Sequence, residues 1–221
     1  IYSGDFDVAR IIQGLSALTG VDIIPGKTLI FLDEVQAFPQ ALEALKYFCE
    51  DAPEYHIVVA GSLLGVALHA GVSFPVGKVQ TLRLFPMDFE EFLMAMGEEQ
   101  LLKLMHSHDY ELMNAFHEKL KDLLRQYYYV GGMPEVVKAF AENKLLNQVR
   151  SLQNEILSNY ASDFSKHAPS QEVPRIDMVW QSILGQLSKE NKKFVYGVLK
   201  KGGRAKEFEL AIQWLVDAGL V

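Results

Sequence analysis

The stretch Thr28-Leu29-Ile30-Phe31-Leu32-Asp33-Glu34 decides the fold of this chain. Its apolar residues have no polar partner on either face, which is typical of a strand buried on both sides in a parallel sheet. The spacing of residues 39–50 predicts a helix, and residues 55–60 form a second apolar run that Gly61 ends. A strand, a helix and a second strand make a βαβ unit, whose crossover is almost always right-handed. The sequence therefore predicts the α/β class.

Further elements extend outward from this unit. We expect a helix over residues 5–18, ended by Gly20, and a third strand from Val79 to Phe85. After Pro86 the apolar spacing becomes helical, and the predicted helices cover residues 88–96, 98–130, 134–142 and 144–163.

The prolines and small polar residues from Ser165 to Pro174 indicate a linker. Three short helices are predicted beyond it, over residues 176–187, 189–200 and 207–218. We therefore expect three parts, which are residues 1–95, 96–174 and 175–221.

Two adjacent carboxylates, Asp33 and Glu34, end the first apolar strand. Ligands of parallel α/β sheets bind at the carboxyl ends of the strands. There Asp33 can hold a Mg²⁺ ion through its water shell, and Glu34 can polarise the water that attacks the γ-phosphate of ATP. The alternative is a strand that ends in two solvated acids, because so short a motif also arises by chance.

Ser62 follows the second strand, in the sequence Ala60-Gly61-Ser62. If the two strands are neighbours, Ser62 lies at the same sheet edge as Asp33, where its hydroxyl can orient water or contact the γ-phosphate. Ser62 can also cap a helix over residues 63–68, and both roles are compatible because a capped helix N-terminus favours anions.

Lys27-Thr28, after Pro25-Gly26, resembles the end of a phosphate-binding loop. That loop must run into a helix whose N-terminus faces the phosphates, whereas Lys27-Thr28 runs into a strand. We therefore interpret this stretch as an ordinary turn and expect the phosphate cradle to lie outside the chain. Arg83, near the end of the third predicted strand, can approach a nucleotide or pair with surface acids.

The order and spacing of the last three predicted helices resemble those of a helix-turn-helix, and Leu220-Val221 can begin the strand of a wing. Such modules often bind DNA. The helix over residues 207–218 carries Glu207, Glu209 and Asp217, however, which suits a phosphate backbone poorly. Protein contact is therefore as plausible as DNA binding for this segment.

The net charge of −7 excludes a global basic field that would attract nucleic acid. The charge is uneven, because residues 175–221 hold eight Lys/Arg against five Asp/Glu, which leaves about −10 for the first 174 residues.

Cys49 is the only cysteine, so an intramolecular disulfide is excluded and a reducing compartment such as the cytoplasm is expected. Its helical position predicts a buried thiol. No apolar run is long enough for a membrane span, and both ends of the chain look like cuts in a longer protein.

Four blocks of the sequence resemble the prokaryotic AAA+-like P-loop ATPases that carry a C-terminal domain of unknown function. In chain order, the blocks are residues 29–36, 59–62, 84–93 and 131–137. The resemblance implies a partial P-loop NTPase-type parallel sheet, a helical lid and a winged-helix-like segment. It also implies that Asp33 and Glu34 are the Walker B pair and that Ser62 is near the sensor 1 position. Many relatives have Gly-Arg where this chain has Gly77-Lys78, which leaves the arginine finger unassigned.

Together these features predict an AAA+-like ATPase that needs ATP and Mg²⁺ and couples hydrolysis to a conformational switch. Asp33 and Arg83 are the expected cofactor-binding residues, and Glu34 and Ser62 the catalytic ones. Two alternatives stay open, a non-hydrolysing module locked by ATP and a DNA-binding regulator. Because the phosphate cradle is expected elsewhere, residues 1–221 alone should bind ATP weakly or not at all.

Overall fold

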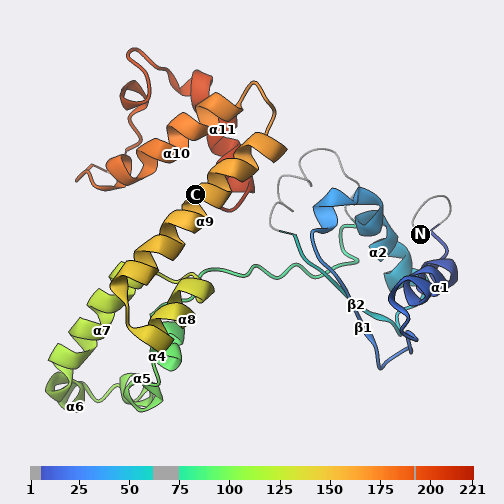
Figure 1. The fold of residues 1–221 in the computed structure, drawn as a ribbon, viewed down its shortest axis with the longest axis horizontal. Coiled ribbons are helices and arrows are strands. Elements are labelled where there is room, and N and C mark those ends of the chain that lie inside the picture. Colours follow the sequence, from blue (N-terminus) through green and yellow to red (C-terminus); the bar gives the residue numbers. More distant parts are fainter. Residues whose placement is uncertain (1–5, 62–74, 192) are drawn as a thin grey trace. The chain divides into compact units, whose positions relative to one another are not determined.

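Two parallel strands, β1 (Leu29–Leu32) and β2 (His56–Val59), lie side by side in the computed structural model, which describes residues 6–61, 75–191 and 193–221 (Figure 1). Their register pairs Leu29 with His56 and Leu32 with Val59. The connection between them contains a short 3-10 turn, η1 (Val35–Ala37), and the helix α2 (Pro39–Asp51). The predicted βαβ unit is confirmed.

The prediction that β1 is buried on both faces is wrong. The side chain of Ile30 is 6% exposed, whereas those of its neighbours Leu29 and Phe31 are 58% and 57% exposed. In β2, Val58 is 47% exposed. One face of the sheet packs on α2 and on α1 (Val8–Thr19). No described residues pack over the other face, which therefore stays exposed in this two-stranded sheet. The core of this part is formed by apolar residues of α1, β1 and α2, among them Ile11, Leu15, Ile30, Leu42, Leu45 and Phe48.

The two ends of α1 have local causes. Asp7 caps the first turn, since its Oδ1 accepts a hydrogen bond from Ala9 N at 2.8 Å. Gly20 ends the helix with φ of 71°, in the left-handed region that glycine adopts readily. The helix predicted over residues 5–18 is therefore confirmed, with its start at Val8.

Cys49 is exposed in the last turn of α2, so the prediction of a buried thiol is wrong. The buried stripe of α2 runs through Ala41, Leu42, Ala44 and Leu45 and ends at Phe48.

The strand predicted from Val79 to Phe85 is also wrong. No strand pairs with this segment in the described part of the chain, although its alternation suits a strand. Leu82, Leu84 and Phe85 are 86%, 100% and 71% exposed. Alternation alone does not make a strand, because the backbone of a strand needs a hydrogen-bonded neighbour.

The chain divides into two compact units, residues 1–81 with 167–221 and residues 82–166. The second unit is helical. Its helices are α4 (Phe89–Ala95), α5 (Glu99–His106), α6 (Tyr110–Ala115), α7 (His117–Val130), α8 (Pro134–Asn143) and most of α9 (Leu146–His167).

The region 98–130, predicted as one helix, is divided among α5, α6 and α7. His108 has φ of 55°, which breaks the helix between α5 and α6. The predicted linker from Ser165 to Pro174 is wrong at both ends, since α9 continues to His167 and α10 begins at Val173. The division of the chain at residues 95 and 174 stays a prediction.

Two segments far apart in the sequence meet in the second unit. Met87 N donates to Gly132 O at 2.7 Å, and the hydroxyl of Tyr127 donates to Met87 O at 2.9 Å. Gly131 ends α7 with φ of 77° and ψ of −171°, a conformation that only glycine adopts without strain. The blocks 84–93 and 131–137 are therefore joined through their backbones. Phe92 and Tyr127, with ring centroids 5.4 Å apart, belong to the core beside this junction.

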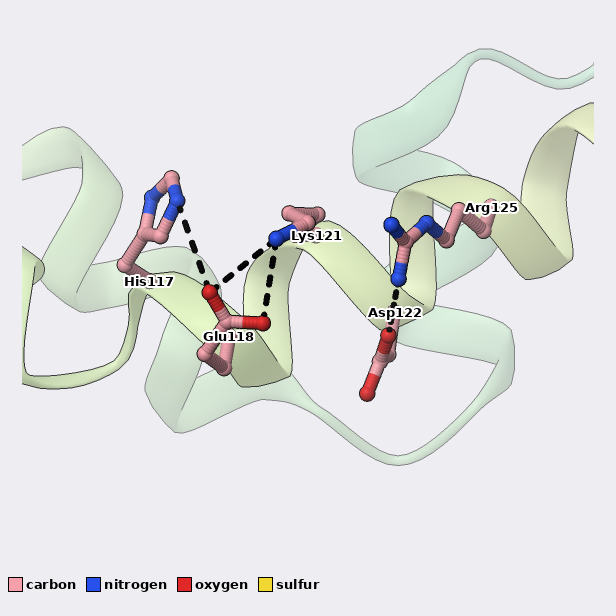
Figure 2. A network of polar contacts seen from close by, with 5 residues as sticks. All are labelled: His117, Glu118, Lys121, Asp122 and Arg125. Carbon is pink, nitrogen blue, oxygen red and sulfur yellow. Dashed lines mark hydrogen bonds and ion pairs between the residues drawn. The ribbon is translucent and has the colours of Figure 1, made fainter.

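The outer face of α7 is charged (Figure 2). Lys121 Nζ lies 3.0 Å from Glu118 Oε1, and Arg125 Nη1 lies 3.0 Å from Asp122 Oδ1. His117 Nε2 lies 3.9 Å from Glu118 Oε1. Exposed pairs of this kind contribute about 0.3–0.5 kcal/mol each, so they add little to the stability of the unit.

The C-terminal part contains α10 (Val173–Leu187) and α11 (Ala205–Asp217), which pack together. The helix predicted over residues 189–200 is wrong, since the described residues there form only a 3-10 turn, η2 (Tyr196–Val198). The reason is a contact from α10. Gln186 Nε2 donates to Val195 O at 3.0 Å, and Val195 N donates to Gln186 Oε1 at 3.1 Å. The Gln186 amide thus occupies the N–H and the C=O of Val195, which a helix would need for its own hydrogen bonds. The winged-helix-like segment stays a prediction.

Candidate functional site

The carboxyl ends of β1 and β2 are adjacent. Their pairing continues past the strands, because Ala60 N donates to Leu32 O at 2.8 Å and Val35 N donates to Ala60 O at 3.0 Å. Asp33 and Glu34 therefore lie beside Gly61 at one edge of the sheet. The predicted proximity of the two strand ends is confirmed as far as Gly61. Ser62 lies outside the described residues, so its role stays a prediction.

Asp33 and Glu34 form a sharp turn at this edge. Glu34 has φ of 51° and ψ of 40°, a left-handed conformation that costs a residue with a Cβ about 1–2 kcal/mol. Asp33 Oδ1 accepts a hydrogen bond from Glu34 N at 2.9 Å. Asp33 Oδ2 accepts no hydrogen bond within the described residues, and both side chains are exposed. The turn thus presents two carboxylates with a free oxygen on Asp33.

Gln36 is part of this site, although the sequence analysis missed it. Its Nε2 donates a hydrogen bond to Glu34 Oε2. Its Oε1 is buried and has no hydrogen-bond partner among the described residues. The same oxygen lies against Gly61, where a Cβ would be 2.2 Å away. The signal that could have revealed it is a glutamine two residues after the acid pair, together with a glycine at the end of the neighbouring strand.

Replacing Gly61 with alanine should displace the Gln36 side chain from Glu34. The clash involves the end of a side chain that can rotate away, so the free energy of unfolding should fall by no more than about 1 kcal/mol. The NMR signals of the Gln36 side-chain amide in the full chain measure the displacement. Gly185→Ala is the control, since a Cβ there meets nothing within 4 Å. Unchanged Gln36 amide signals in Gly61→Ala would contradict the contact.

The residues Pro25 to Thr28 form a closed turn, as predicted. Lys27 N and Thr28 N donate to Ile24 O at 3.1 and 3.0 Å, and Thr28 Oγ1 accepts from Ile24 N at 2.9 Å. Thr28 then leads directly into β1. Gly26 N donates to Glu54 O at 2.8 Å, so the backbone donors of this turn are already engaged within the unit and it is not a phosphate-binding loop.

Two cations that follow β2 in the sequence, Lys78 and Arg83, differ in their contacts. Lys78 Nζ lies 3.0 Å from Glu50 Oε1 of α2, and this hydrogen bond together with the charge of Glu50 raises the pKa of Lys78. The ion pair contributes stability below the ordinary lysine pKa and loses it as pH rises through the raised value. Arg83 is exposed and belongs to the second unit, so its contact with a nucleotide stays a prediction.

The donor set of the site suits magnesium. No cluster of three or more His, Cys, Asp or Glu residues able to hold a metal occurs in the part of the chain that the structure describes. Mg²⁺ does not require such a cluster, because it keeps several waters and commonly takes one or two carboxylates together with substrate phosphates. The unengaged, exposed oxygen of Asp33 fits this mode of binding.

A parallel βαβ unit with an acid pair at its carboxyl edge is typical of nucleotide-binding α/β domains. Comparison with known families agrees, because residues 5–93 match the family model of an AAA domain. This match supports an AAA-like ATPase domain in the first part of the chain. Residues 121–221 match the model of a domain of unknown function, DUF8612. No curated protein matches the chain. Within the described residues, no helix combines the length and the apolar character needed to cross a bilayer.

Proposed function

We propose that the chain carries the hydrolysis side of an ATP site and that ATP hydrolysis drives a conformational switch. The observation that supports it best is the turn Asp33-Glu34 at the carboxyl edge of a parallel βαβ unit, in a region that matches an AAA domain. The expected cofactors are ATP and Mg²⁺, and the expected setting is the cytoplasm.

In this proposal Asp33 serves the metal ion. Its Oδ1 is held by the backbone of Glu34, which fixes the carboxylate and leaves Oδ2 for a water of the Mg²⁺ shell. The bound ion would neutralise charge on the β- and γ-phosphates, which is its main contribution to phosphoryl transfer.

Glu34 orients the attacking water in the same proposal. Its carboxylate is held on one side by Gln36 Nε2, which leaves the other oxygen to accept a hydrogen bond from water. Ser62, just after β2, would contact the same water or the γ-phosphate, and Arg83 would approach the phosphates. A helical lid and a winged-helix-like segment would transmit the switch to a protein partner or to a second copy.

Two other functions are distinguishable from this one. In a non-hydrolysing module, ATP would lock one conformation, and turnover would not depend on Glu34. A DNA-binding regulator would act through residues 176–221. The described residues of the range 189–200 form no α-helix, so they do not supply the helix-turn-helix arrangement on which that hypothesis relied, and other contacts with DNA stay open.

We expect Asp33→Asn in the full-length protein to raise the Mg²⁺ concentration needed for half-maximal turnover. The rise should be about tenfold or more, because Asp33 would hold the ion through a bound water and loss of such an outer-shell partner typically costs about 10- to 100-fold in metal affinity. Asparagine can still accept the hydrogen bond from Glu34 N, so the turn should persist. Phosphate release at saturating ATP with titrated Mg²⁺ is the measurement.

Asp122→Asn is the matched control, because it removes the same charge from the outer face of α7. It should leave the Mg²⁺ requirement unchanged. If Asp33→Asn needs no more Mg²⁺ than the wild type, Asp33 does not serve the metal ion. If the wild-type protein shows no Mg²⁺-dependent release of phosphate, the proposed function itself is wrong.

A further inference from the structure

Positive charge is concentrated between α10 and α11, in a chain whose net charge is −7. Residues 189–206 contain seven of the 21 Lys and Arg residues and one acid, Glu190. Four of the cations lie close together, from the turn that precedes α11 into the first turn of that helix, and we call this segment the basic turn: Lys200, Lys201, Arg204 and Lys206. A local excess of this kind can attract a polyanion that the acidic remainder of the chain would repel.

The backbone of the basic turn is fixed by its two glycines. Gly203 N donates to Lys200 O at 2.8 Å, and Gly202 has φ of 77°. A Cβ at Gly203 would lie 3.0 Å from the carbonyl oxygens of Lys200 and Tyr196. The two glycines therefore suit the tight closure of the chain at this point.

Contacts on either side anchor the turn to the two helices. Val195 is held by the Gln186 amide of α10, and Tyr196 stacks on Phe208 of α11 with ring centroids 6.4 Å apart. Phe208 is 2% exposed. The cations thus extend from an ordered backbone, and ordering it costs less entropy on binding than ordering a disordered tail.

Little of the charge is neutralised within the chain. Lys200 Nζ lies 3.7 Å from Glu207 Oε2. Lys201, Arg204 and Lys206 are exposed and form no ion pair with another residue of the described part. Like charges so close in sequence repel one another, and an external anion relieves that repulsion.

We infer that the basic turn binds the phosphate backbone of a nucleic acid. A nucleic acid offers closely spaced phosphates, and release of their counterions supplies affinity without a shaped pocket. Contacts of this type position a protein on the strand and do not read its sequence. They differ from the contacts of a recognition helix, since the acidic residues of α11 take no part in them.

Two other polyanions fit the turn less well. An anionic membrane is bound by amphipathic helices with a basic polar face, whereas α11 carries Glu207, Glu209 and Asp217. Acidic motifs of peptides are bound by clusters of arginines, whereas the basic turn holds a single arginine, Arg204, beside its lysines.

Fluorescence anisotropy of labelled duplex DNA, single-stranded DNA and RNA of equal length, titrated with the full chain, tests the inference. At low salt we expect binding, and log affinity should fall against log salt with a slope of about −3 for the duplex, which corresponds to three or four phosphates. The three probes show which nucleic acid is preferred.

The variant Lys201→Gln/Arg204→Gln/Lys206→Gln should bind at least about tenfold more weakly at low salt, with a slope near zero. Lys46→Gln/Lys103→Gln/Lys138→Gln is the matched control, because it removes the same charge from exposed positions elsewhere. The control should bind like the wild type. If the first triple variant does not fold, as judged by its thermal transition, Lys201→Gln and Lys206→Gln singly should each reduce the slope by about 1.

Several outcomes would overturn the inference. They are no binding of any nucleic acid at low salt, equal loss in the control, and unchanged binding in the basic-turn variants. Equally tight binding of polyglutamate or of phosphatidylserine vesicles would assign the turn to a protein or a membrane.

Discussion

Glu34→Gln in the full-length protein is expected to lower ATP turnover by about 100-fold or more, because a positioned general base contributes at least that much. Glutamine has nearly the size of glutamate and can still accept the hydrogen bond from Gln36 Nε2, so the turn at the end of β1 should be preserved. It cannot take up the proton of the attacking water. Equilibrium binding of ATP should therefore stay unchanged while phosphate release is lost.

Glu54→Gln is the matched control for this prediction. Glu54 precedes β2 and is exposed, so it lies at the amino end of the strand, whereas Glu34 lies at the carboxyl edge. The control removes the same charge from the same unit and should leave turnover unchanged. Slow turnover that is equal in wild type and Glu34→Gln would favour the non-hydrolysing module, and an equal loss in both variants would indicate a general electrostatic effect.

Gly132→Ala should destabilise the second unit by about 3 kcal/mol, at the upper end of what an extra methyl group costs in a well-packed site. A Cβ at this position would lie 2.2 Å from Met87 O and 2.9 Å from Met87 N. Those atoms belong to the backbone and are held by Gly132 O and by the Tyr127 hydroxyl, so they cannot rotate away as a side chain would. The junction between the blocks 84–93 and 131–137 must therefore separate.

Hydrogen exchange of the full chain, followed segment by segment, measures this effect, because it reports local opening free energies. Protection should fall across α4, α7 and α8. Gly97→Ala is the control, since its φ of 77° causes strain but a Cβ meets nothing within 4 Å. Its cost should be about 1–2 kcal/mol, the cost of a left-handed conformation for a residue with a Cβ. Equal effects of the two substitutions would show that the contact with Met87 is not the cause.

Local patterns were reliable where neighbouring residues decide the structure. The apolar runs before Asp33 and Gly61 indicated β1 and β2, and the strand after Lys27-Thr28 excluded a phosphate-binding loop. The pattern failed where a partner was needed. Val79 to Phe85 alternates like a strand but has no hydrogen-bonded neighbour in the described residues. Residues 189–200 have helical spacing, but Gln186 occupies the backbone of Val195.

The sequence by itself determined the βαβ unit and the place of Asp33 and Glu34 at its carboxyl edge, because strand period and helix period are properties of a continuous stretch. Only the tertiary structure revealed that Gln36 lies between Glu34 and Gly61 and that Gly132 must be a glycine beside Met87. It also revealed that the contact between Tyr196 and Phe208 anchors the backbone beside the basic turn. The physical reason is that these contacts join segments distant in the sequence. Their side chains meet only after the chain has folded, so no local pattern specifies them.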